Sequence, residues 1–64
     1  MKMKELKNLA KKIAKCEYII QHSDDKEAVR KAEDEVIKLS GSVKSLEDIM
    51  VIDELVQELL AADS

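Results

Sequence analysis

Proline, phenylalanine and tryptophan are absent from this chain, and glycine, cysteine, histidine and tyrosine occur once each. A single cysteine cannot close an intramolecular disulfide, and no Cys/His cluster has the spacing of a metal site. Glycine and proline are the residues that most often interrupt regular structure. Their scarcity, in a chain that is 39% charged and rich in Lys and Glu, indicates an all-helical protein.

Long hydrophobic runs are also missing. No apolar stretch approaches the roughly 18 residues of a membrane-spanning helix, and residues 1–5 lead into no signal-peptide hydrophobic region. We therefore expect a cytoplasmic protein without a membrane partner, in which Cys16 stays reduced.

The 64 residues are enough for one domain, which at this size buries only about 60% of its unfolded surface. We predict an all-α, up-down-up three-helix bundle over residues 1–64, with helices at about 2–22, 24–39 and 45–62. Because so small a domain has little net stability and no visible staple, we expect it to self-associate through the third helix.

The first helix is predicted from apolar residues in the 3,4,3,4 spacing of an amphipathic helix, at Leu6, Leu9, Ile13, Cys16 and Ile20. This apolar phase shifts by two positions in the following segment, which predicts a turn near His22. Ser23 is the expected N-cap of the second helix, with Asp24 and Glu27 as an alternative capping box. Fusion of the first two segments into one helix of about 57 Å is the competing topology.

The second helix is expected to stop at Ser40-Gly41-Ser42. Gly41 can adopt the left-handed conformation that often follows a helix end. Ser45 is then a suitable N-cap for the third helix, with Asp48 three residues later.

A polar cap, a charged outer face, an alanine-rich seam and a Ser/Gly connector follow one another from Ser23 to Ser42. This stretch, about a third of the chain, resembles the idealised helices and loops of computationally designed helical bundles. The first helix, with Cys16 and Tyr18, and the Met50-Val51-Ile52 run depart from that style, and no natural family is recognised. The resemblance implies a scaffold or assembly module without a biological substrate.

The third segment carries nine apolar residues in the fifteen positions from Leu46 to Leu60. On a helix they cover roughly 260° of the circumference, whereas a surface helix needs a stripe only a little over about 100° wide. The segment is therefore either a central core helix or a surface that binds a partner. For the second interpretation, the predicted interface residues are Met50, Val51, Leu55 and Leu59.

Catalytic chemistry has few candidates. Cys16 and His22 point about 120° apart on one helix, and with Tyr18 they are too few for an oriented triad. Glu17, Asp48 and Asp53 interrupt apolar faces, and we interpret them as rim carboxylates paired with Lys rather than as a catalytic pair or a metal site. We expect no enzyme activity, no cofactor and no metal.

Charge is distributed unevenly, with a net of +4 over residues 1–22, −2 over residues 23–41 and −5 over residues 42–64. A basic first segment and an acidic last one can attract each other within a bundle or across a dimer. We predict a non-enzymatic interaction module that forms a homo-oligomer, with a dimer favoured, or binds a helix of a partner protein.

The alternative function is phosphate or nucleic-acid binding by a basic face of the first helix. Lys4, Lys7, Lys11 and Lys15 fall within about 80° of arc, and Tyr18 continues this face. The chain is acidic overall and has one Arg and no aromatic platform for bases. We therefore expect labelled duplex and single-stranded DNA to remain unbound at about 50 mM salt, whereas binding that weakens as salt rises would support the alternative.

Overall fold

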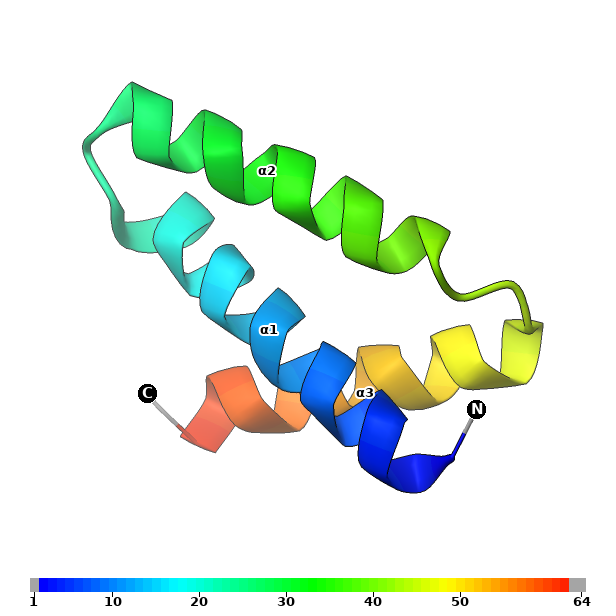
Figure 1. Cartoon of the computed structure of the whole chain (residues 1–64). Helices are drawn as coiled ribbons and strands as arrows, with labels where there is room; N and C mark the ends of the chain where they lie inside the picture. Colours follow the sequence, from blue (N-terminus) through cyan, green and yellow to red (C-terminus); the bar gives the residue numbers. More distant parts are fainter. Residues whose placement is uncertain (1, 63–64) are drawn as a thin grey trace.

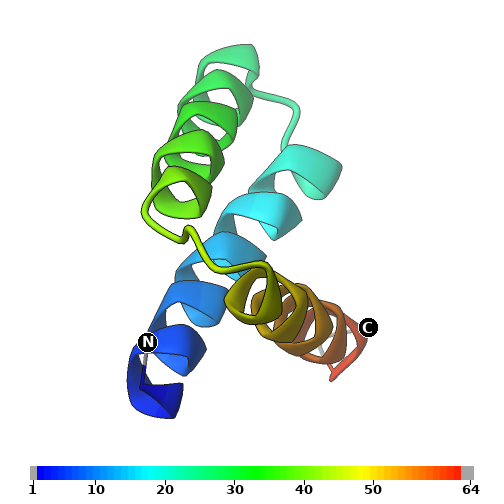
Figure 2. The same ribbon diagram turned by 90° about the vertical axis from the view of Figure 1, so that its right-hand side faces the viewer.

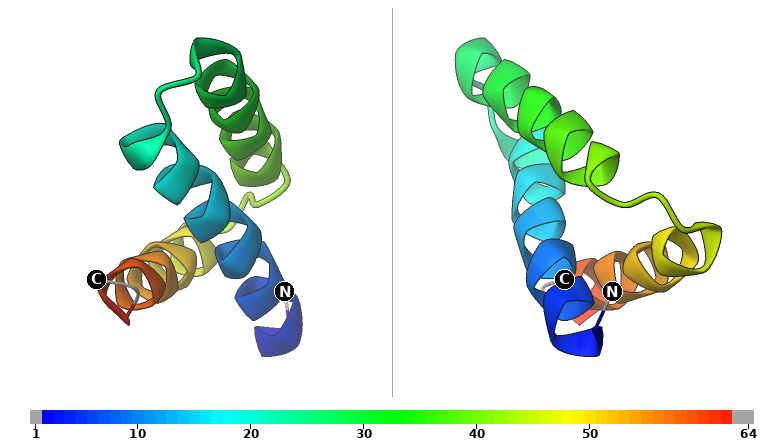
Figure 3. Two further views of the ribbon diagram at one scale, coloured as in Figure 1. Left: turned by 90° about the vertical axis from the view of Figure 1, so that its left-hand side faces the viewer. Right: turned by 45° about the vertical axis from the view of Figure 1, so that its right-hand side comes forward.

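The computed structural model describes residues 2–62, and this part of the chain forms three helices (Figure 1). They are α1 (Met3–His22), α2 (Lys26–Gly41) and α3 (Leu46–Ala62). α2 returns alongside α1, and α3 then crosses α1 obliquely (Figures 2 and 3). The predicted all-α three-helix bundle is confirmed, and fusion of the first two helices is wrong.

A three-residue turn separates α1 from α2, and two of its side chains accept hydrogen bonds from nearby backbone N–H groups. The Ser23 hydroxyl oxygen accepts a hydrogen bond from the Asp25 backbone N–H at 3.2 Å. Asp25 is the N-cap of α2, and its carboxylate accepts from the Glu27 N–H at 3.0 Å. The expected Ser23 cap and Asp24–Glu27 capping box are therefore wrong. Ser23, Asp24 and Asp25 are all suitable N-cap residues, and Asp25 is the one that caps α2.

The connection between α2 and α3 also differs from the expected one. Gly41 belongs to α2 and does not take a positive φ, so the expected left-handed conformation is wrong. Ser42 is the C-cap of α2, and its hydroxyl donates to the Leu39 carbonyl oxygen at 2.7 Å. Ser45 immediately precedes α3, and its carbonyl accepts the Ile49 N–H at 3.0 Å. This is the backbone bond expected of the predicted N-cap position.

α1 lies at the centre of the fold, because the main helix contacts are those of α1 with α2 and of α1 with α3. Ala10 is completely buried, and a side chain this small allows α3 to approach the α1 backbone closely. The core cluster comes from α1, α3 and the α2–α3 loop: Leu6, Ala10, Ile13, Ala14, Val43, Ile52 and Val56. The interpretation of the third helix as the central core helix is therefore wrong.

α3 is covered mainly on the side that meets α1. Ile52 and Val56 are buried there, whereas Leu46 and Met50 are largely exposed. None of the described helices is long and apolar enough to cross a membrane.

The packing of Ile52 against α1 can be tested with a matched pair of isoleucines. Ile52 is 7% exposed and Ile37 is 69% exposed. We expect Ile52→Val to lower the free energy of unfolding by about 0.5 to 1.5 kcal/mol, the usual cost of one buried methylene. Ile37→Val should change it little. Urea unfolding followed by circular dichroism measures both, and equal losses would contradict the assigned core.

Candidate functional site

An open groove of about 370 Å³ lies where the three helices meet. We call it the three-helix groove. α1 contributes Ile13, Glu17 and Gln21 to its lining, and α2 contributes Val36 and Ser40. The α3 lining residues are Ile49, Met50, Ile52, Asp53, Val56, Gln57 and Leu60. Its volume falls in the lower part of the range of about 300 to 1,000 Å³ that is typical of binding pockets.

Exposed apolar side chains gather on the groove side of α3. Leu46 is 73% exposed, Met50 60% and Ile49 45%, and we call these three residues the α3 apolar patch. They lie in the first turns of α3 and span about 100° of its circumference. Ile49 and Met50 line the groove, and Leu46 lies about 20° from the groove residue Asp53 on the helical wheel.

A further exposed apolar residue lies on α2. Ile37 lies about 60° farther round the helix than Ser40, on the side away from buried Ala32. Because Ser40 lines the three-helix groove, this spacing places Ile37 beyond the groove's α2 edge. The apolar surface is thus not restricted to α3.

The structure separates the four predicted interface residues. Met50 is exposed and lines the three-helix groove. Val51, Leu55 and Leu59 are half-buried and pack against the core cluster. Leu55 and Leu59 line a hollow of about 220 Å³ that they share with Lys7 and Lys11 and not with Met50. Leu46, Ile49 and Ile37 are also exposed, and our sequence analysis left them out of the interface.

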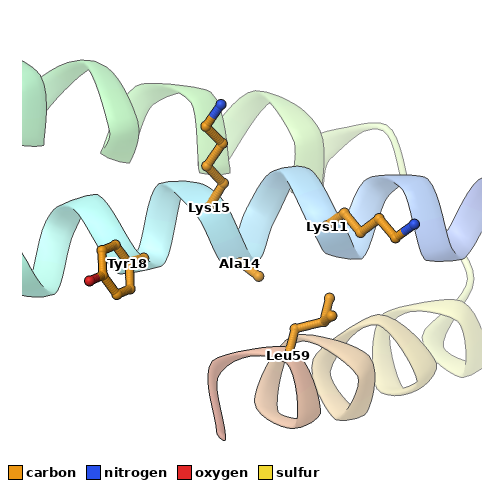
Figure 4. A pocket seen from close by; sticks show the side chains of 5 residues that line it. All are labelled: Lys11, Ala14, Lys15, Tyr18 and Leu59. Atoms are coloured by element: carbon orange, nitrogen blue, oxygen red, sulfur yellow. The ribbon is translucent and has the colours of Figure 1, made fainter. Parts of the chain in front are cut away.

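Two lysines of the predicted basic face lie at one hollow but do not converge. Lys4, Lys7, Lys11 and Lys15 are all exposed, and Lys11 and Lys15 border an open hollow of about 410 Å³ with Ala14, Tyr18 and Leu59 (Figure 4). The Lys11 and Lys15 side chains point in different directions, while Leu59 points toward Ala14. The two ammonium groups are therefore not arranged to hold one phosphate between them.

Candidate catalytic groups stay apart as well. Cys16 and His22 lie about 9 Å apart along the axis of α1, since each residue adds about 1.5 Å. His22 instead stacks on Tyr18, with ring centroids 4.4 Å apart and an interplanar angle of 36°. Across residues 2–62, no three His, Cys, Asp or Glu side chains are grouped so that they could hold a metal ion.

The three carboxylates that interrupt apolar faces differ in exposure. Glu17 and Asp48 are half-buried, and Asp53 is exposed. Glu17 and Asp53 both line the three-helix groove, one from α1 and one from α3. The structure therefore brings two of the three together around one groove. Their pairing with Lys stays a prediction.

Comparison of the chain with protein-family models, curated proteins and solved structures gave no match.

The Cys16 thiol is held in its neutral form. It is half-buried in α1, and desolvation raises its pKa. The negative charges of Glu35 on α2 and Glu17 raise the pKa further, and the positive charge of Lys15 opposes them. A thiol with a raised pKa carries little thiolate at neutral pH and is a poor nucleophile.

We expect iodoacetamide to alkylate Cys16 more slowly in the folded protein than in urea, with a rate that rises only at more alkaline pH than for an ordinary thiol. Glu35→Gln should move this pH midpoint downward, because it removes a repulsive charge. Glu33→Gln is the control on the same helix. Because folding disfavours the thiolate, the free energy of unfolding should also fall as pH rises through the raised pKa. Fast alkylation at pH 7 would contradict this assignment.

Proposed function

We propose that this chain is a non-enzymatic helical interaction module that binds another helix through the three-helix groove and the α3 apolar patch. The bound helix belongs either to a partner protein or to a second copy of the chain. The observation that supports the proposal is the grouping of Leu46, Ile49 and Met50, which are 73%, 45% and 60% exposed, on one side of α3. Neighbouring apolar side chains left exposed in this way are typical of interaction sites.

The composition of the patch suits an adaptable contact. Met50 has an unbranched side chain that fits differently shaped partners, and each large apolar side chain that becomes fully buried contributes about 1.5 to 3 kcal/mol. Ile52 and Val56, which are buried next to the patch, anchor the same helix to α1. The patch is therefore presented on a helix whose position is already determined by the core.

Two exposed methionines provide a matched test of self-association. Met50 lies in the α3 apolar patch and is 60% exposed, whereas Met3 is 54% exposed in the first turn of α1. If a second copy is the partner, light scattering on a sizing column should give a mass above the 7.2 kDa of one chain that rises over a hundredfold range of concentration. Met50→Lys should return the mass to one chain, and Met3→Lys should not.

The choice of position matters because Val51 and Leu55 pack against the core cluster. Lysine at either position would lower the free energy of unfolding as well as disturb a surface. An oligomer that survives Met50→Lys would contradict the proposed surface. So would a protein that stays a monomer and binds no helical peptide.

A further inference from the structure

The three-helix groove carries negative charge and no positive charge. Among its lining residues, all within the described part of the chain, Glu17 and Asp53 are acidic and none is Lys, Arg or His. The remaining polar lining groups are the neutral side chains of Gln21, Ser40 and Gln57. A helix that enters this groove therefore meets an apolar surface with carboxylates on α1 and on α3.

α3 as a whole has the same sign of charge. Between Leu46 and Ala62 it carries five acidic residues and no basic one: Glu47, Asp48, Asp53, Glu54 and Glu58. Asp53 lies on the same side of the helix as the α3 apolar patch, so two copies that met through these patches would bring their Asp53 carboxylates to the contact, with the other acidic residues of both helices around it. Like charges brought together at an interface oppose association and exclude wrong partners. The charge of α3 therefore disfavours a second copy as the occupant.

The lysine-bearing face of α1 in a second copy is also a poor match for the three-helix groove. The large apolar side chains that α1 leaves exposed are Met3 and Tyr18, and they lie about 22 Å apart along the helix. A second copy that presented this face would bring lysines to the groove but little continuous apolar surface. Apolar contact and positive charge together require a different helix.

We propose that the three-helix groove binds one amphipathic helix of another protein, apolar on one face and flanked there by lysine or arginine. This inference rests on the proposed function and adds the chemistry of the partner. The apolar face packs on Ile49 and Met50, and the flanking cations lie near Glu17 and Asp53. Such a helix joins α1, α2 and α3 as a fourth helix, a common way for an amphipathic helix to occupy a groove.

The test uses three labelled synthetic peptides of about 16 residues, close to four helical turns. They share one apolar stripe at i, i+3, i+4 and i+7 and differ only in the flanking residues, which are Lys, Gln or Glu. We expect fluorescence anisotropy at about 25 mM salt to show the Lys peptide binding about tenfold more tightly than the Glu peptide. The difference should shrink at about 500 mM salt, where exposed charges are screened.

Variants of the protein then locate the contact. Met50→Lys should abolish binding of the Lys peptide, and Met3→Lys should leave it unchanged. Asp53→Asn should weaken the Lys peptide by roughly threefold, as expected for one exposed ion pair, without affecting the Gln peptide. Glu54→Gln removes the same charge from the next residue, which does not line the groove, and should have a smaller effect. Circular dichroism verifies that each variant stays helical.

The outcomes separate this inference from the proposed function. Equal binding of the Lys and Glu peptides, lost in Met50→Lys, would overturn the basic partner and leave the interaction module in place. A failure of all three peptides, together with a mass that rises with concentration, would identify a second copy as the occupant and overturn the inference alone. A failure of all three peptides by a protein that remains a monomer would overturn both.

Discussion

The fold depends on the packing of α1, because α1 is the helix on which both of the others bury their apolar residues. Ala10 and Ala14 are the positions that make this possible on the α3 side. They are 0% and 8% exposed, and larger side chains there would hold the helices farther apart. Leu6 and Ile13 complete the same surface of α1. Because α2 and α3 both pack mainly against α1, little apolar surface is left to cover their other faces.

This constraint explains where sequence reasoning succeeded. The three helices follow from the apolar spacing around Leu6 and Ile13, from the phase shift near His22 and from the Ser/Gly stretch after Leu39, all of which are local signals. Local signals compete where several residues are equally suitable. For that reason the cap was assigned to Ser23, whereas the structure places it at Asp25.

The arrangement of the helices was harder to predict, because an apolar arc shows how much of a helix is hydrophobic and not what covers it. α3 has the widest arc but is not the central helix, since the small side chains of Ala10 and Ala14 gave α1 a modest hydrophobic pattern. Val43 was missed altogether, because it lies in a loop without periodicity, yet it is 7% exposed and belongs to the core cluster. The exposed patch at Leu46 and Met50 follows from helix crossing, which depends on tertiary contacts.

Charge and packing act together on α3. Its exposed apolar patch lies on a helix that carries five acidic residues and no basic one. A helix with net charge of one sign resists association with its own copies. The Lys-rich flank of α1 lies on the other side of α3, where Lys7 and Lys11 border the hollow that contains Glu58. Positive charge is therefore close to α3 on one side and absent from the groove lining on the other. In the proposed interaction, the same carboxylates that oppose contact between like patches attract the cationic helix to the groove.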